Sequence, residues 1–182
     1  MNKNVLALSI ITALSGLALT ACGGSDGDSN NNSDQGGTGS KPALTAVFID
    51  SPVEGLNYTC ASYEAITDKA GTFSFNDGDT CTFKLGSIEL GKTVAKKGQT
   101  MVTPYTIAKE GDKDHAIRIA ALLQTMDDDG KPENGITLKA EDVAKLPNTI
   151  NFDKDVDFNT SLKEALIQAQ INKTVVLSLI HI

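Results

Sequence analysis

Apolar and polar residues alternate in short runs between residues 46 and 90, and turn residues separate the runs. Alternation with a period of two is typical of half-buried β-strands. Strands this short, with turns at such regular spacing, favour a small antiparallel β-sandwich or meander within residues 41–92. The pattern predicts strands at Ala46–Asp50, Leu56–Cys60, Thr72–Phe75, Cys81–Leu85 and Ile88–Leu90.

The period of the apolar residues changes after Gly91. Residues 93–176 read as a mixed and mainly helical region. Within it, His115–Met126 places most of its apolar side chains on one side of a helix, which is the pattern of an amphipathic helix. Asp112 or Asp114 is the expected N-cap, because a carboxylate accepts the free N–H groups of a first turn.

Two further helices are predicted toward the C-terminal end. Ser161–Gln170 carries an apolar stripe, and Ser161 with Glu164 has the spacing of a capping box. Lys139–Leu146 is expected as a short helix that ends before Pro147, because proline disfavours helical geometry in the residue before it. The fold class expected is therefore α+β, with a small antiparallel β-sandwich-like module followed by helices.

The N-terminal run has a different character from the rest of the chain. Lys3 precedes the largely apolar stretch Val5–Leu19, and small residues follow at Thr20 and Ala21. This is the layout of a secretory signal peptide covering residues 1–21, and the apolar stretch is too short for a membrane-spanning helix.

The four residues Leu19-Thr20-Ala21-Cys22 resemble the lipobox of bacterial lipoproteins. That resemblance implies cleavage before Cys22, a diacylglycerol on its sulfur and an acyl chain such as palmitate on its amine. Several acyl chains give lasting membrane attachment where one does not. The alternative is an ordinary signal peptide followed by a chance cysteine.

Residues 22–40 carry no apolar side chain after the cysteine, so they cannot bury a core and are expected to form a flexible tether. Such a coil spans about 20–25 Å on average. Gly23 stands where lipoproteins of enteric type retained in the inner membrane have Asp. The resemblance therefore implies an outer-membrane or cell-surface location, with the membrane contacted through the lipid anchor.

The last six residues, Leu177–Ile182, match the read-through translation of a widely used transposase sequencing adaptor. We therefore expect the natural chain to diverge after Val176 and this sequence to be an N-terminal fragment of a longer one. The alternative is a genuine apolar strand. Setting these residues aside removes His181 and leaves His115 as the remaining histidine.

The charge balance excludes one class of partner. The chain has 16 basic and 23 acidic side chains, and loss of Lys3 with the signal peptide brings the net charge from −7 to −8. An acidic chain is repelled by phosphate backbones and by anionic lipid. We therefore expect no nucleic-acid partner, and an extracellular protein or glycan is the partner expected of a surface module.

Cys60 and Cys81 remain once Cys22 is assigned to the lipid, and an even pair in an oxidising compartment predicts a disulfide. Closing a loop of about 20 residues contributes roughly 3 kcal/mol in the chain-entropy account. A metal or redox site, the other use of paired cysteines, is expected to have closer spacing or more ligands.

Three segments, Asp50–Tyr58, Thr67–Phe75 and Thr82–Gly91, together resemble a module of large surface lipoproteins from marine and enteric gammaproteobacteria. A similar stretch occurs near the N-terminus of accessory colonisation factor AcfD-type lipoproteins, and the turn and aromatic pattern is similar to carboxypeptidase-regulatory-like sandwiches. The resemblance covers about residues 46–136. AcfD-type lipoproteins carry a mucin-degrading metalloprotease domain further along, but its zinc motif is not in this sequence, so the resemblance assigns no catalytic residue.

The acidic loop, Asp127–Gly135, follows the first predicted helix, and it is the candidate metal site. With Gly130 as the turn glycine, Thr125, Asp127 and Asp129 take the first three ligand positions of a helix–loop calcium motif. The match fails at Ile136, where a bidentate Glu belongs. Calcium at Asp127 and Asp129 and a solvated acidic loop at a helix end both remain open.

Signs of catalysis are weak. A Ser-His-Asp site would have to use His115. The position of His115 at the start of a predicted helix is explained more simply by helix capping or by surface exposure. The sequence contains no nucleophile-elbow or phosphate-loop motif. The sequence therefore predicts a membrane-anchored surface lipoprotein whose present region is not an enzyme but a stalk or a binding or adhesion module. The alternative is the N-terminal non-catalytic part of a longer secreted lipoprotein hydrolase, such as a metalloprotease.

Overall fold

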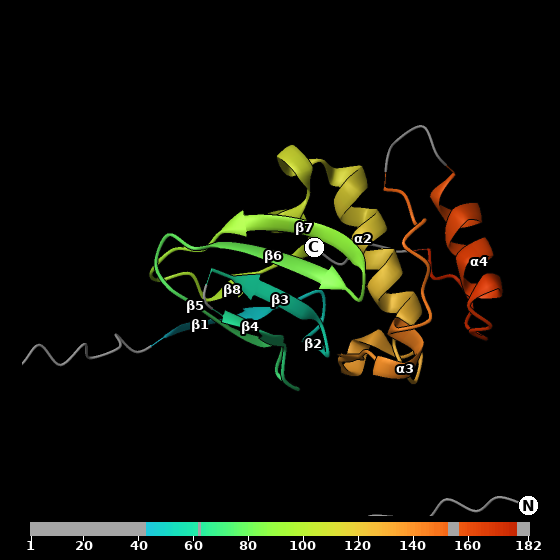
Figure 1. The fold of residues 1–182 in the computed structure, drawn as a ribbon, viewed down its shortest axis with the longest axis horizontal. Coiled ribbons are helices and arrows are strands. Elements are labelled where there is room, and N and C mark those ends of the chain that lie inside the picture. Colours follow the sequence, from blue (N-terminus) through green and yellow to red (C-terminus); the bar gives the residue numbers. More distant parts are fainter. Residues whose placement is uncertain (1–42, 62, 153–156, 178–182) are drawn as a thin grey trace, which may run out of the picture. The chain divides into compact units, whose positions relative to one another are not determined.

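The computed structural model describes residues 43–61, 63–152 and 157–177, which belong to one unit spanning residues 40–182. Strands predominate in the first half of this unit and helices in the second, so the α+β fold class is confirmed (Figure 1).

A four-stranded antiparallel sheet has the order β4-β3-β6-β7. It consists of β3 (Asn57–Cys60), β4 (Tyr63–Ile66), β6 (Thr80–Leu85) and β7 (Ile88–Val94). The alternating burial of β6 follows its sequence pattern. The sequence did not predict the edge strand β4, because its last three residues are all exposed and show no alternation.

A three-stranded sheet has the order β5-β1-β8. Strand β1 (Leu44–Phe48) pairs antiparallel with β5 (Thr72–Phe75) and parallel with the two-residue β8 (Met101–Val102). The bounds of β5 agree with the sequence prediction, and both of its phenylalanines are buried on one face.

Aromatic side chains join these two sheets. Phe48 of β1 lies against Phe83 of β6, with ring centroids 5.0 Å apart. Phe73 of β5 meets Phe83 edge-on at 5.1 Å and Tyr58 of β3 at 5.7 Å. Edge-to-face packing of this kind adds to the stabilisation from apolar burial. The two sheets thus pack through one aromatic core, as in a sandwich.

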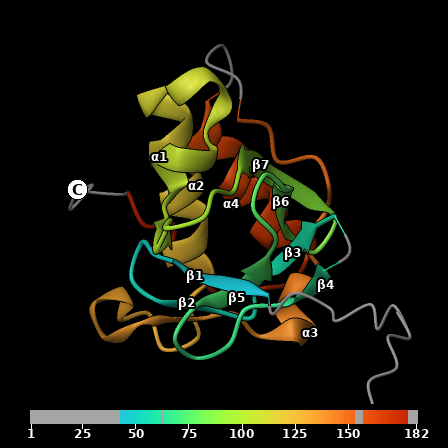
Figure 2. The ribbon, with the colours of Figure 1, turned by 90° about the vertical axis from the view of Figure 1, so that its left-hand side faces the viewer.

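The helical region begins with α1 (Pro104–Ile107), capped by Thr103, and a 3₁₀ turn η1 (Lys109–Gly111). The long helix α2 (Lys113–Met126) confirms the predicted amphipathic helix. Its N-cap is Asp112, whose carboxylate accepts the backbone N–H groups of Asp114 and His115. In Figure 2, α1 and α2 lie on the same side of the unit.

The predicted start of the last helix is wrong. α4 covers Phe158–Gln168, so it begins three residues before Ser161 and ends before Gln170. Its N-cap is Asp157, which accepts hydrogen bonds from the backbone N–H and the hydroxyl of Thr160. Ser161 lies inside the helix, where its backbone N–H donates to the Asp157 carbonyl oxygen, so the free donors of the first turn are satisfied at Asp157 and not at Ser161.

The short helix α3 (Ala140–Val143) lies within the predicted range, and turns continue it to Leu146. Between α2 and α3, the chain forms the 3₁₀ turn η2 (Pro132–Asn134) and the strand β9 (Ile136–Thr137). β9 pairs in parallel with β2 (Val53–Glu54), which ties the helical region to the β module. Buried residues of both regions belong to one hydrophobic cluster.

Candidate functional site

The residues that the sequence singled out fall into two groups. Cys22 and its lipobox lie outside the described residues, as do the tether and residues 178–182. Cys60, Cys81, His115, Asp127 and Asp129 all lie within them.

The disulfide between Cys60 and Cys81 is confirmed. The two cysteines face each other directly across the β3–β6 pair, and both are fully buried. The bond therefore fixes the register of two core strands, which is a structural role.

Asp127 lies at the start of the acidic loop, and its carboxylate binds both the middle of the loop and the strand that follows it. It is the C-cap of α2, and its side chain is buried. One carboxylate oxygen accepts the backbone N–H of Thr137 at 2.9 Å, and the other accepts the backbone N–H of Lys131 at 2.8 Å. Such charge-assisted hydrogen bonds are stronger than neutral ones, so Asp127 holds the loop against β9.

Asp129 is brought to the same point, since it also accepts the N–H of Lys131, at 2.9 Å. Its other oxygen accepts from the amide of Asn134, and this bond is the main cause that lowers the pKa of Asp129. Thr125, expected at the first ligand position, instead accepts the backbone N–H of Val176 with its hydroxyl. The structure therefore brings Asp127 and Asp129 together but uses Thr125 elsewhere.

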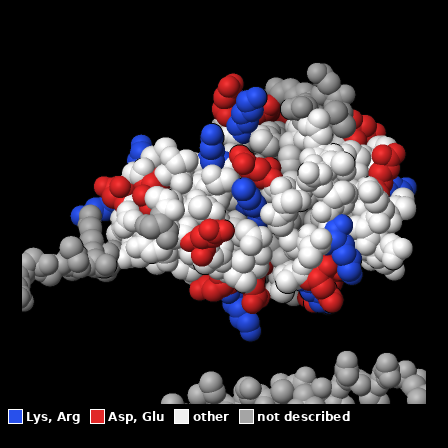
Figure 3. Space-filling view, viewed as in Figure 1, with Lys and Arg blue, Asp and Glu red and all other residues white. Residues whose placement is uncertain are grey.

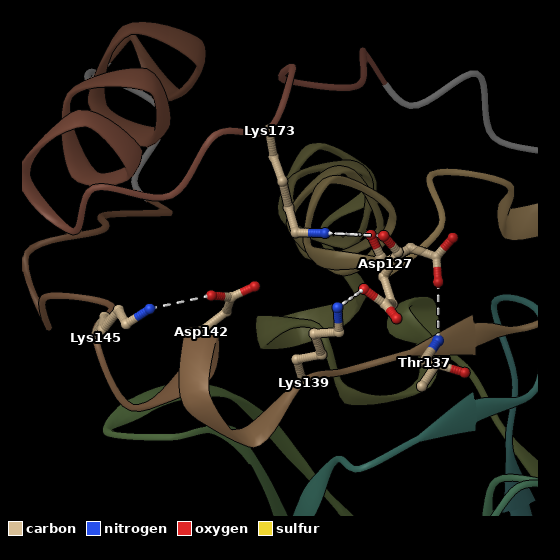
Figure 4. A network of polar contacts seen from close by, with 7 residues as sticks. Asp127, Thr137, Lys139, Asp142, Lys145 and Lys173 are labelled. Carbon is tan, nitrogen blue, oxygen red and sulfur yellow. Dashed lines mark hydrogen bonds and ion pairs between the residues drawn. The ribbon is translucent and has the colours of Figure 1, made fainter.

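Two lysines supply positive charge at this loop (Figure 4). The Lys139 ammonium lies 2.6 Å from the Asp128 carboxylate, and this contact raises the pKa of Lys139. The Lys173 ammonium donates to the carbonyl oxygens of Asp127 and Asp128. Cations are favoured there because the C-terminus of a helix carries partial negative charge.

Within residues 43–61, 63–152 and 157–177, no group of three or more His, Cys, Asp or Glu side chains is placed to hold a metal ion. Calcium at Asp127 and Asp129 stays a prediction. Its remaining ligands have to come from carbonyl groups or water.

His115 contributes to the start of α2. Its Nδ1 accepts the backbone N–H of Lys109 at 3.0 Å, and its ring lies 5.3 Å from that of Phe152. Both contacts are those of a residue that joins η1 and a later loop to the helix.

The sequence analysis missed a cavity of about 430 Å³ beside the acidic loop. We call it the Asp50 cavity. Two features of the sequence could have indicated this cavity. One is the acidic residue Asp50 at the end of a predicted apolar strand, and the other is the polar residue Gln124 within a mostly buried helix. The cavity is lined by Asp50, Ser51, Gln124, Pro132, Glu133, Val176 and Leu177, of which Leu177 belongs to the hexapeptide attributed above to the sequencing adaptor.

Asp50 is the most perturbed group of this cavity. Burial raises its pKa, and the hydrogen bond from the Gln124 side-chain amide, at 2.9 Å, only partly offsets that effect. A partly desolvated carboxyl in a cavity marks a candidate binding site, because burial of a charge without a cation is costly.

A second cavity, of about 340 Å³, has both signs of charge in its lining, with Arg118 beside Asp114 and Asp157. The Arg118 guanidinium donates to the carbonyl oxygen of Phe152. The lining of this second cavity carries charges of both signs and therefore favours no single charge of ligand, so the Asp50 cavity is the stronger candidate.

In the part of the chain that the structure describes, no helix has the length and apolar character needed to cross a membrane. Comparison of the chain with known protein families, curated proteins and solved structures finds no match.

Proposed function

We propose that the chain is a lipid-anchored surface lipoprotein and that its folded residues form a non-catalytic stalk or binding module held outside the cytoplasm. The observation that carries the proposal is the Cys60–Cys81 disulfide. Disulfides form and persist in oxidising compartments. A buried disulfide between core strands is therefore what an exported chain is expected to contain.

The sequence supports the same compartment independently. A signal peptide followed by Leu19-Thr20-Ala21-Cys22 provides export and an acylated cysteine, and residues 22–40 provide a tether. The surface is also compatible with this setting. On the face in Figure 3, acidic and basic side chains are interspersed, as expected of a soluble module beside a membrane.

The test is Cys22→Ser in a bacterial host, followed by membrane fractionation and detergent partitioning. The variant should lose membrane association, because the acceptor of the lipid is gone. The double variant Cys60→Ser with Cys81→Ser is the matched control, since it removes thiols without touching the anchor and should stay in the membrane fraction. Unchanged partitioning of Cys22→Ser would overturn the proposal.

A further inference from the structure

We propose that the Asp50 cavity binds a primary ammonium group carried on a short aliphatic chain. This rests on the binding-module form of the proposed function and names the chemistry that such a module would recognise.

The lining of the cavity carries charge of one sign. Among the described residues, Asp50 and Glu133 are its ionisable groups, and none of the lysine, arginine or histidine side chains within 43–61, 63–152 and 157–177 lines it. Within the described residues, neither carboxyl forms an ion pair. An anionic ligand would meet two carboxylates, whereas a cation would gain from both.

The hydrogen-bonding geometry suits a compact donor. Gln124 donates to one oxygen of Asp50, which holds the carboxyl in place, and among the described residues no hydrogen bond reaches its other oxygen. An ammonium carries three N–H donors, and one of them can bond to the single Asp50 oxygen that Gln124 leaves available. A guanidinium prefers a carboxylate with both oxygens available for a two-bond fork, and Asp50 has one oxygen engaged.

The rest of the lining suits an aliphatic chain. Pro132 and Val176 contribute apolar surface, and the volume of about 430 Å³ falls in the ordinary range for small-molecule sites. Calcium requires six to eight oxygen ligands, which favours a different architecture from this half-apolar lining. Burial raises the pKa of Asp50 because its ionised form has lost water and has no cation nearby to stabilise it. A bound ammonium would supply that positive charge.

The probes are 1,5-diaminopentane, for a free polyamine, and Nα-acetyl-lysine methylamide, for a lysine side chain of a protein. Binding to the chain from residue 22 onward, carrying Cys22→Ser, is measured by calorimetry and by amide chemical shifts. The titration runs at about pH 8, where carboxyl groups are ionised. 1-Pentanol is the neutral control ligand, and potassium chloride at matched ionic strength controls for screening.

We expect the amines to bind, with shifts centred on Asp50, Ser51 and Gln124, and the tighter of the two to identify the source. Asp50→Asn keeps an acceptor for Gln124 but removes the charge, so the Kd should rise about tenfold or more. Glu133→Gln should weaken binding less, because that side chain is exposed. Glu64→Gln on β4, also exposed, is the matched control and should leave the Kd unchanged.

Absence of amine binding would overturn the proposal, as would equal binding of 1-pentanol, calcium binding in place of the amine, or an unchanged Kd in Asp50→Asn. Asp50→Asn is interpreted only if its amide spectrum away from the cavity matches that of the parent chain, and Glu133→Gln gives a second reading at a position that does not threaten folding. These outcomes are independent of membrane association, so failure here is distinguishable from failure of the lipid anchor.

Discussion

The ammonium nitrogen of Lys173 lies 2.6 Å from the carbonyl oxygen of Asp127, the C-cap residue of α2. The two residues are 46 positions apart in the sequence. The contact ties the segment after α4 to the end of α2 and places a positive charge where the helix carries partial negative charge.

Lys173→Met should lower the free energy of unfolding by about 0.5–2 kcal/mol, because it removes both the hydrogen bond and the favourable charge at the helix end. Urea denaturation measures the change. Lys145→Met is the matched control. Lys145 makes a surface ion pair with Asp142 three residues earlier, so its loss should cost at most about 0.5 kcal/mol. Equal costs for the two variants would contradict a specific role for Lys173.

Removing the disulfide by Cys60→Ala with Cys81→Ala should lower the free energy of unfolding by about 2–4 kcal/mol, because the unfolded chain regains the entropy of a closed loop. Guanidinium denaturation of the oxidised and reduced forms gives the same quantity independently. Thiol labelling of the unfolded, oxidised chain should find Cys60 and Cys81 unreactive, and labelling of both without reductant would show that the bond is absent.

Gly71 and Gly78 form a matched pair, since both have positive φ, at +76° and +89°. A Cβ at Gly71 would lie 2.5 Å from the carbonyl oxygen of Phe48, whereas a Cβ at Gly78 would meet nothing within 4 Å. Both alanine variants place a residue with a Cβ in left-handed backbone, which should lower the free energy of unfolding by about 1–2 kcal/mol. Gly71→Ala should cost about 1–3 kcal/mol more, because the clash is with backbone that cannot move aside. Equal losses in thermal or urea unfolding would show that the β1 backbone yields.

The raised pKa of Asp50 predicts a pH dependence of known sign. The folded state holds this proton more tightly than the unfolded state, so the contribution of Asp50 to stability falls as pH rises from its ordinary value of 3.8 through the raised value. The stability of Asp50→Asn relative to the parent chain should therefore increase across that window, as followed by urea denaturation at a series of pH values.

Asp157→Asn provides the control of opposite sign. Hydrogen bonds from Thr160 lower the pKa of Asp157, so the stability that Asp157 contributes is present above its ordinary pKa and is lost as pH falls. The deficit of this variant should shrink on acidification. Parallel pH profiles for the Asp50 and Asp157 variants would contradict both assignments.

Calcium at the acidic loop predicts a rise in Tm that magnesium reproduces poorly, because magnesium demands tighter octahedral geometry. Extracellular calcium sites bind with a Kd of about 0.1–1 mM, so the titration should reach tens of millimolar. At about 100 times the Kd, the gain is roughly 2.7 kcal/mol. Asp129→Asn should abolish the shift and leave the metal-free protein folded, since Asp129 is exposed. Equal shifts from both ions that persist in the variant would mean charge screening.

Where the residues of one element carry a clear apolar pattern, that pattern predicted the element. The apolar spacing of 115–126 predicted α2, and the cap candidates Asp112 and Asp114 included the N-cap found, Asp112, because helical hydrogen bonds and caps join residues close in sequence. The alternation of Thr72–Phe75 and of the residues around Cys81 determined two core strands, because one face of each is buried. The proposed assignment of Cys22 to a lipid anchor left Cys60 and Cys81 as the pair expected to form a disulfide.

The tertiary structure decided what depends on distant partners. Strands as short as β2, β8 and β9 have no periodicity of their own and exist because a remote segment satisfies their backbone groups. The hydrogen bond between Asp50 and Gln124 joins residues 74 positions apart, and the cavity beside them forms only where the turn after β1, helix α2, η2 and the segment after α4 converge. Burial of Asp50 depends on that convergence, so no pattern local to Asp50 revealed its raised pKa.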